Sequence, residues 1–307
     1  MKKIKIDFFV LGAQKAGTTS LHYWLSEYPN VDLPIIKETH FFSDMDRHQK
    51  GVDWYQIQFK NTGENKIIGE IDPEYLFSEN AHLKIKKQTT ANKFIIILRH
   101  PLDRAFSHYQ MSVRRGYENL NFTDALLMEK SRINSLGSFA LDNYSYIARG
   151  MYSQQILRFK NTFPNAEFLF IKFENLISPE TQLSTFIELC NFIGIDPLQK
   201  SINFNLKYNE SSQPKSLYIR NLLFSNNRKF NLTRKIARLF IKNQTSRLKL
   251  AMWLDKKNSK TTPSTRHNLI IDPQIQKEVE KDITVTEIIT GLNLTDYIDN
   301  KANNYTY

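Results

Sequence analysis

The chain has 307 residues, enough to bury a sizeable core as one large domain or as one domain with a helical appendage. No apolar run approaches the roughly 18 residues that a membrane-spanning helix needs, and the single cysteine, Cys190, excludes disulfides within the chain. The net charge of +11 comes almost wholly from residues 211–260, which hold thirteen Lys/Arg against one acid. This basic segment indicates an anionic partner: an acidic substrate, an anionic membrane or a nucleic acid.

The first residues, MKKIKIDFFVL, are basic and then apolar, as the start of a signal peptide is. Asp7 interrupts the apolar run, however, and no small-residue cleavage site follows it. We therefore interpret this stretch as the first strand of the fold. A cytoplasmic location is the expectation that follows.

Short β-rich runs alternate with longer helical patterns along the first two hundred residues. The runs lie at 8–12, 66–71, 94–99 and 167–173, and the helical patterns at 18–27, 103–115, 145–161 and 180–193. This alternation is typical of a parallel sheet with helices on its faces. We predict an α/β fold with a P-loop-like parallel β-sheet flanked by helices.

The character of the chain changes after about residue 197. The stretch KFNLTRKIARLFIKNQTSRLKLAMWL has the pattern of a basic amphipathic helix, and a further helical section is predicted at about 263–290. We predict a single domain over 1–307 with an α/β core and a helical, basic C-terminal part. Its parts are a core at 6–200, a mostly helical section at 201–300 and a polar tail at 301–307.

The turn after the first strand reads Gly12-Ala-Gln-Lys15-Ala-Gly17-Thr18-Thr19. In a Walker-type loop the lysine directly follows the second glycine and a magnesium-binding Ser/Thr follows the lysine, whereas here Lys15 lies inside the loop. Backbone N–H groups at a helix N-terminus, with the hydroxyls of Thr18, Thr19 and Ser20, still suit a phosphate. A tight turn that merely requires glycine is the alternative.

A second cation stands at the end of the third β-rich run, in IIILRHPLDRAFSHY. Magnesium-dependent NTPases commonly place an acidic metal ligand at such a position, but this chain has Arg99 there. Because ligands gather at the carboxyl ends of parallel strands, Arg99 is predicted to bind a second phosphate, with Ser107 as a further donor. The two elements together predict metal-independent binding of a nucleotide that carries phosphates at both ends.

These two stretches resemble the 5′- and 3′-phosphate motifs of sulfotransferases that use 3′-phosphoadenosine 5′-phosphosulfate (PAPS). The blocks KETHFF (37–42), GEIDPEYLF (69–77) and the segment 145–176 occur in similar form and order in that family. The resemblance covers at least residues 6–200, and PSTRHNL and TEIITGLNLTDY are similar to the family's C-terminal section. The order of the blocks is most similar to heparan-type carbohydrate sulfotransferases and their bacterial relatives.

The resemblance implies a role for individual residues. Glu38 would be the catalytic base, with His40 beside it in the acceptor site, and Lys15 would stabilise the departing phosphate. The PAPS-binding set would comprise Gln14, Lys15, Ala16, Gly17, Thr18, Thr19, Ser20, Arg99, Ser107 and Arg266, without a metal. Arg149 and Tyr152 begin a helix that resembles a family segment near the cosubstrate.

One departure from the heparan-type pattern concerns the second block, in which those enzymes have a lysine after the glutamate and this chain has Ile71. The missing cation puts a heparan-like acidic acceptor in doubt. The alternative interpretation of Ile71 is a core residue at the end of an apolar strand. Glu70 and Asp72 compete with Glu38 as candidates for the base. Trp54 and Tyr55 are interpreted either as sugar-stacking surfaces or as core.

The sequence therefore predicts sulfuryl transfer from PAPS to a hydroxyl or an amine, most simply on a saccharide. A nucleotide or small-molecule kinase is the first alternative, which dependence on ATP and magnesium would reveal. A non-enzymatic protein that binds nucleic acid or membrane is the second, and steep salt dependence without nucleotide preference would reveal it. No nucleic-acid partner is expected under the main prediction, while the basic segment 211–260 is open to contact with an acidic substrate or an anionic membrane.

Overall fold

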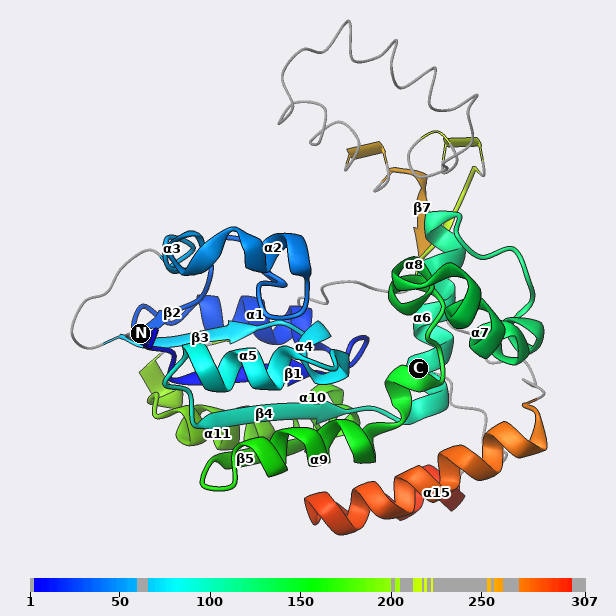
Figure 1. Cartoon of the computed structure of the whole chain (residues 1–307). Coiled ribbons are helices and arrows are strands. Elements are labelled where there is room, and N and C mark those ends of the chain that lie inside the picture. The colour runs from blue at the N-terminus through cyan, green and yellow to red at the C-terminus, as the bar shows by residue number, and fades with distance from the viewer. Residues whose placement is uncertain are drawn as a thin grey trace, which may run out of the picture. The chain divides into compact units, whose positions relative to one another are not determined.

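The computed structural model of the chain describes residues 3–59, 66–199, 202–204, 212–216, 218–219, 222, 253–254, 257–261 and 271–299 (Figure 1). The chain divides into two compact units. The first comprises Met1–Arg104, Arg149–Tyr208 and Lys277–Asn300, and the second comprises Ala105–Ala148, Asn209–Gln276 and Lys301–Tyr307. Among the described residues, no helix combines the length and the apolar character that crossing a membrane requires.

The first unit is built on a five-stranded parallel sheet of order β2-β3-β1-β4-β5. Its strands are β1 (Phe8–Gly12), β2 (Val31–Asp32), β3 (Ile67–Ile71), β4 (Lys93–Leu98) and β5 (Glu167–Lys172). The four β-rich runs of the sequence correspond to β1, β3, β4 and β5 to within one residue at each end. β2 has only two residues, too few for a periodic pattern, and it was not predicted.

The middle strand, β1, has no charged residue because helices cover both faces of the sheet. Phe8, Phe9, Val10 and Leu11 of β1 are all fully buried. Phe8 is paired with Gly69 of β3, and a Cβ atom at Gly69 would lie only 2.2 Å from the Phe8 ring. The absent side chain of Gly69 therefore makes room for the ring of its neighbour.

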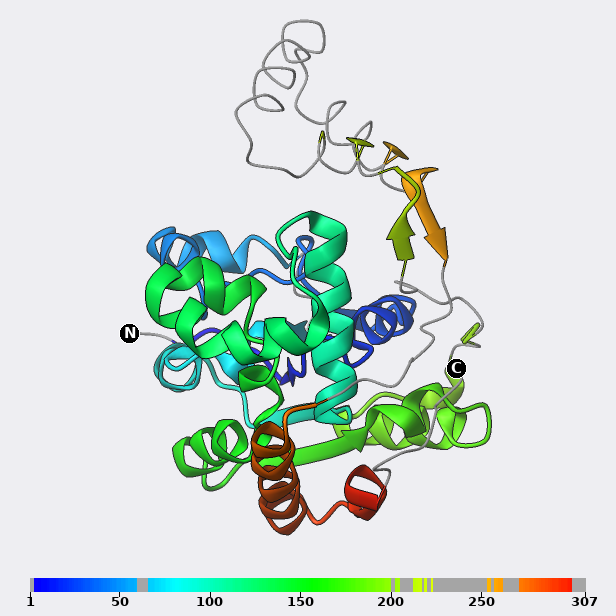
Figure 2. The same cartoon turned by 90° about the vertical axis from the view of Figure 1, so that its right-hand side faces the viewer.

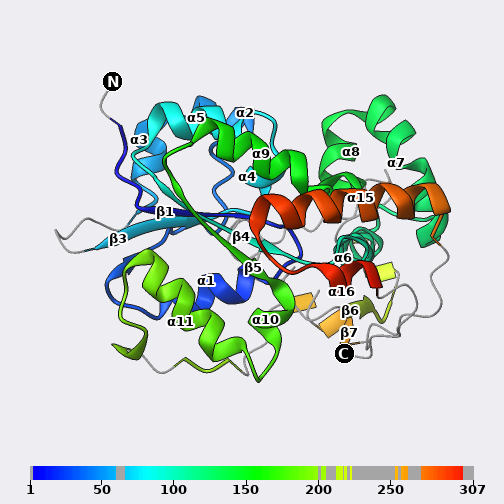
Figure 3. The same cartoon turned by 90° about the horizontal axis from the view of Figure 1, so that it is seen from below.

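Helices α1 (Thr18–Ser26) and α11 (Gln182–Ile193) cover one face of the sheet, and α5 (Ala81–Gln88) and α9 (Tyr152–Thr162) cover the other (Figure 3). Trp24 of α1 and Phe186 of α11 meet edge to face, with ring centroids 5.9 Å apart. On the opposite face, Phe159 of α9 packs on Phe94 of β4 at 5.9 Å. The prediction of a parallel sheet flanked by helices is confirmed.

Several short helices connect these elements. They are α2 (Met45–Gln49), α3 (Gly51–Gln56), α4 (Glu74–Phe77), α10 (Phe173–Ile177) and the 3-10 turn η2 (Pro197–Gln199). The helix predicted at 145–161 is divided, because the 3-10 turn η1 (Ala148–Gly150) precedes α9. The other predicted helices of the core are found at the expected places.

The C-terminal part of the first unit contains most of α15 (Pro273–Thr290) and all of α16 (Thr295–Asp299). The helical section predicted from residue 263 is thus helical from Pro273, and residues 262–270 lie outside the described residues. Lys160 of α9 donates to the carbonyl of Ile289 at 2.9 Å, and Lys172 of β5 binds Asp296 at 2.7 Å. These contacts attach the C-terminal helices to α9 and to β5.

The second unit contains most of α6 (Pro101–Arg115) together with α7 (Phe122–Leu136) and α8 (Ser138–Asn143) (Figure 2). Its core is a cluster of Ala105, Phe122, Ala125, Leu126, Ala140, Tyr144 and Tyr146. α7 begins at Asn121, whose side chain accepts from the N–H of Asp124 at 3.0 Å. Neither α7 nor α8 was predicted from the sequence.

Only part of the basic segment 211–260 is described. Within it, β6 (Ser212–Pro214) and β7 (Ser259–Thr261) form an antiparallel pair, and neither strand was predicted from the sequence. The basic amphipathic helix predicted in the stretch 229–254 lies outside the described residues except for residues 253 and 254.

Candidate active site

Residues 13–17 turn the chain from β1 into α1 at the carboxyl edge of the sheet. Ala13 N–H donates to the carbonyl of Ile97 at 2.8 Å, which fixes the start of the turn on β4. Gly17 has a φ of 81°, and a Cβ atom there would lie 3.1 Å from the Phe173 ring, so both conformation and space call for glycine. The first turn of α1 contains no acidic residue. The turn therefore presents the positive end of a nine-residue helix.

Arg99 follows β4 and reaches this turn, as predicted from the sequence. Its Nη1 donates to the carbonyl of Lys15 at 3.0 Å, and its guanidinium carbon lies 4.7 Å from the centroid of the Phe173 ring. The buried atoms Arg99 Nε and Gln14 Oε1 have no hydrogen-bond partner in the described part of the chain. A buried guanidinium N–H without a partner fits an anionic group that would complete it.

Glu38 and His40 lie in a loop that is held against the same sheet. Glu38 pairs with Lys37, and both side chains are about a quarter exposed, at 27% and 26%. Burial, and then the charge of Lys37, lower the pKa of His22 in α1 to about 4. The charge of Lys37 therefore acts on α1, the helix that follows residues 13–17.

Glu70, the last but one residue of β3, is fully buried beneath this loop. Its Oε1 accepts from the N–H and hydroxyl of Thr39, at 3.2 and 2.5 Å. Its Oε2 accepts from the hydroxyls of Tyr55 and Tyr75, at 2.7 and 3.0 Å. Burial and the neighbouring charge of Asp72 raise the pKa of Glu70 to about 7, although the donated hydrogen bonds oppose this shift. All four hydrogen bonds come from donors of the protein itself. The oxygens of Glu70 are therefore already engaged with protein groups.

Asp72, also fully buried, holds His40. One carboxylate oxygen accepts from the backbone N–H of His40 at 2.7 Å, and the other lies 3.1 Å from the imidazole Nδ1. Burial alone would lower the pKa of His40, but the hydrogen bond to Asp72 and the charges of Asp72, Glu74 and Glu38 raise it to about 9. At neutral pH the His40 side chain is therefore an imidazolium next to Glu38.

Three non-glycine residues of the described chain have a left-handed backbone: Lys15 (φ 72°), Glu38 (φ 59°) and His40 (φ 53°). They are the three residues that the sequence predicts to be catalytic. Such a conformation costs about 1–3 kcal/mol per residue and persists only where the surroundings enforce it. Glu70 accepts from the backbone N–H of Thr39 and Asp72 from that of His40, so these two carboxylates hold the backbone within the Glu38–His40 loop.

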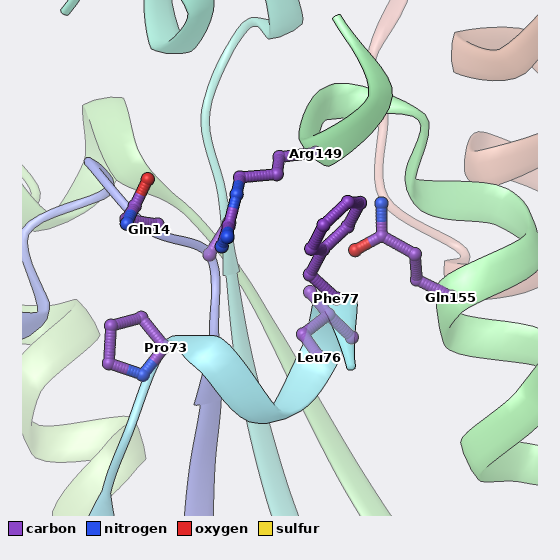
Figure 4. A pocket seen from close by; sticks show the side chains of 7 residues that line it. Gln14, Pro73, Leu76, Phe77, Arg149 and Gln155 are labelled. Atoms are coloured by element: carbon purple, nitrogen blue, oxygen red, sulfur yellow. The ribbon is translucent and has the colours of Figure 1, made fainter. Parts of the chain in front are cut away.

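A small pocket opens beside the turn, lined by Ala13, Gln14, Pro73, Leu76, Phe77, Arg149 and Gln155 (Figure 4). Arg149 Nη2 forms an ion pair of 2.6 Å with Glu74, and its guanidinium carbon lies 4.3 Å from the centroid of the Phe77 ring. Gln14 and Arg149 reach this pocket from separate elements, which Figure 4 displays. Arg149 thus lies close to the turn, as the resemblance implied.

The other predicted residues divide into several groups. Ala16 and Thr18 are buried within the turn and the first turn of α1. Ser107 lies in α6 in the second unit, and Arg266 lies outside the described residues, so the roles of these two stay predictions.

The sequence left two interpretations open for Ile71 and two for the aromatic residues Trp54 and Tyr55. Ile71 is 1% exposed and belongs to the core, as the alternative reading of that position expects. Tyr55 is fully buried on Glu70, whereas Trp54 is partly exposed with Lys50 Nζ 4.7 Å from its ring centroid. Of these two aromatic residues, Trp54 is therefore the one with exposed surface.

Some residues of this site were not found by sequence reasoning. Phe173 supports both Gly17 and Arg99, and Thr39 and Tyr75 complete the environment of Glu70. One signal was present, because Glu70 and Asp72 are two positions apart at a strand end and therefore point to the same side. Nothing in the sequence indicates that Phe173 lies beside the turn.

Comparison with known proteins agrees with this architecture. The sulfotransferase domain family matches residues 5–252. Heparan sulfate glucosamine 3-O-sulfotransferase 5 of Mus musculus is 29% identical over 203 residues, which is 65% of this chain and 56% of that protein. Bifunctional heparan sulfate N-deacetylase/N-sulfotransferase 2 of Homo sapiens is 28% identical over 199 residues, 62% of this chain and 22% of that protein.

Among solved structures, a sulfotransferase from Alicyclobacillus acidocaldarius aligns with a TM-score of 0.65 and 21% identity, covering 96% of this chain and 99% of that one. It shares the fold. The chain spans about half the length of the 3-O-sulfotransferase it matches. Because the family match covers 248 of 307 residues, counted from 5 to 252, the chain belongs to the sulfotransferase family.

Proposed function

We propose that this protein transfers the sulfuryl group of PAPS to an acceptor hydroxyl or amine, with a saccharide as the acceptor class. The observation that carries the proposal is the coincidence of the three left-handed residues with the predicted catalytic set, Lys15, Glu38 and His40. Membership of the sulfotransferase family supports the same reaction class.

The PAPS site would be formed by the turn at residues 13–17, the start of α1 and Arg99. Arg99 contributes a guanidinium with a buried N–H that has no partner among the described residues, and the α1 N-terminus contributes backbone dipoles. PAPS would supply a sulfuryl group on a good phosphate leaving group. Lys15 would place its positive charge where negative charge develops on that phosphate.

Glu38 is the base that this geometry supports best. It is partly exposed, whereas Glu70 and Asp72 are fully buried and engaged with Thr39, Tyr55, Tyr75 and His40. We therefore infer that Glu70 and Asp72 position the loop, while Glu38 accepts the proton from the acceptor. Lys37, which pairs with Glu38, must move aside for the acceptor to reach the carboxylate.

A saccharide acceptor is supported by the relatives named above, two of which carry heparan sulfate in their names. Trp54 is partly exposed, and Lys50 Nζ and the Arg47 guanidinium lie 4.7 and 5.7 Å from its ring centroid, so a sugar that carries negative charge would meet two cations there. Ile71 stands where heparan-type enzymes have lysine, so we propose an acceptor that is less dependent on a cation at that point. The positive charge of the basic segment 211–260 would add to the attraction of an anionic acceptor.

The test is thermal unfolding with 3′-phosphoadenosine 5′-phosphate, ATP or AMP, each in the presence of EDTA. A ligand at a hundred times its dissociation constant stabilises by about 2.7 kcal/mol, which raises the midpoint by several degrees. We expect the bisphosphate to give the largest shift. A preference for ATP that requires magnesium would instead support a kinase and overturn the proposal.

A further inference from the structure

The carboxyl end of β4 is held by residues that lie far away in the sequence. Tyr152, the first residue of α9, is 2% exposed, and its hydroxyl donates to the carbonyl of Arg99 at 2.9 Å. A tyrosine hydroxyl has one proton to donate, and here it is directed at the backbone of the residue that would bind the 3′-phosphate.

Asp282 of α15 fixes the start of α9 and with it Tyr152. Its carboxylate accepts from the N–H of Tyr152 at 2.6 Å and from the N–H of Ser153 at 3.2 Å, and it also binds the hydroxyls of Ser153 and Thr286. Asp282 is 6% exposed. An acid from a helix 130 positions away thus satisfies the unpaired donors at the N-terminus of α9.

Tyr297 of α16 makes a second attachment to the same strand end. Its hydroxyl lies 2.5 Å from Glu174 Oε2 and 3.2 Å from the carbonyl of Leu98, so one proton serves both acceptors. Its carbonyl lies 3.0 Å from Nε2 of His100. Because His100 Nδ1 accepts from the N–H of Leu102, the imidazole proton is on Nε2 and is donated to Tyr297.

Leu98, Arg99 and His100 are therefore each attached to α9 or α16 by a hydrogen bond. The side chain of Arg99 extends from this fixed backbone to the Lys15 carbonyl. A displacement of the Arg99 peptide plane would be transmitted to its guanidinium. Asp282 and Tyr297 both lie beyond residue 252, where the family match ends.

We propose that Tyr152 and Tyr297 are positioning residues that hold the backbone of Leu98–His100 so that Arg99 is directed at the phosphate-binding turn, with Asp282 holding Tyr152. This inference rests on the proposed function, since it assumes that Arg99 binds the 3′-phosphate of PAPS. Under this inference, α15 and α16 contribute to cosubstrate selection as well as to the packing of the fold.

The experiment compares the dissociation constants of 3′-phosphoadenosine 5′-phosphate and AMP by calorimetry, in the wild type, Tyr152→Phe, Tyr297→Phe and the double variant. Phenylalanine keeps the ring and removes only the hydroxyl. Tyr28→Phe is the matched control, because the Tyr28 hydroxyl is also buried and donates to a carbonyl, that of Pro197 at 3.0 Å, away from β4.

We expect Tyr152→Phe to weaken bisphosphate binding about fivefold, the effect of one hydrogen bond, while AMP binding is unchanged. Tyr297→Phe should have a smaller effect and the double variant a larger one. A merely structural role would lower the unfolding midpoint and leave the ratio of the two dissociation constants as in the wild type, which would overturn the inference. A wild type that does not prefer the bisphosphate over AMP would refute the proposed function itself.

Discussion

The ends of β3 and β4, the two strands on either side of β1, use charge in opposite ways. At the end of β4, Arg99 binds the Lys15 carbonyl and retains a buried N–H without a partner in the described chain. At the end of β3, Glu70 is surrounded by four donated hydrogen bonds from Thr39, Tyr55 and Tyr75. The first strand end has capacity for a ligand, whereas the second has used its capacity on the protein.

We infer from this difference that Arg99 contributes mainly to ligand binding and Glu70 mainly to the stability of the fold. A substitution at the Arg99 end should weaken a ligand and change the free energy of unfolding little. A substitution at the Glu70 end should lower the free energy of unfolding, and it should affect catalysis only through the loop that carries Glu38 and His40. The following predictions test this separation.

The largest effect is expected for Glu38→Gln. Removing a general base typically costs about 10²–10⁴-fold in rate, and the amide cannot take the acceptor proton. Initial rates of sulfuryl transfer from PAPS to a saccharide acceptor found by screening measure the loss. Glu188→Gln, an exposed position on α11, is the control that should keep the wild-type rate. A Glu38→Gln enzyme of normal rate would transfer the role of base to another group.

Arg99→Ala should weaken 3′-phosphoadenosine 5′-phosphate binding by about 10- to 100-fold, since hydrogen bonds to charged groups contribute about 1.5–3 kcal/mol. Calorimetric titration measures the change, and Arg115→Ala at the end of α6 is the matched control. The comparison between the strand ends fails if Arg99→Ala lowers the unfolding midpoint strongly and leaves the affinity intact.

Glu70→Ala should lower the free energy of unfolding by about 2 kcal/mol or more, because the Tyr55, Tyr75 and Thr39 donors would lose their buried acceptor. Urea unfolding measures this, with Glu188→Ala expected within about 0.5 kcal/mol of the wild type. Bisphosphate affinity should stay near the wild-type value. Unchanged stability would show that the Glu70 network does not hold the fold.

The smallest effect concerns pH. The pKa of His40 is raised from 6.5 to about 9 in the folded protein, so the folded state holds a proton that the unfolded state has released in this range. The stabilisation is complete below pH 6.5 and is lost as the pH rises towards 9. His40→Asn, which keeps a residue type that tolerates a left-handed backbone, should flatten this part of the stability curve. An equal slope in both proteins would contradict the assignment of His40 as an imidazolium.

Much of the core architecture followed from local patterns. The apolar runs predicted β1, β3, β4 and β5, and the spacing of glycine and lysine predicted a phosphate-type turn with Lys15 inside it. α7 and β2 were missed for different reasons. α7 packs on a small core of its own in the second unit, and β2 contributes two residues whose strand character depends on pairing with β3.

The sequence by itself determined the elements whose signals are contiguous: the buried strands, the turn between Gly12 and Thr19 and the cation after β4. Only the tertiary structure decided which acid is accessible, because the groups that occupy Glu70 come from Thr39, Tyr55 and Tyr75, three separate segments of the chain. It also decided that Tyr152 and Tyr297 meet the end of β4, at separations of 53 and 199 residues. A hydrogen bond forms only when donor and acceptor lie within about 3 Å of each other. Residues so far apart in the sequence reach that distance only once the sheet and its helices have packed.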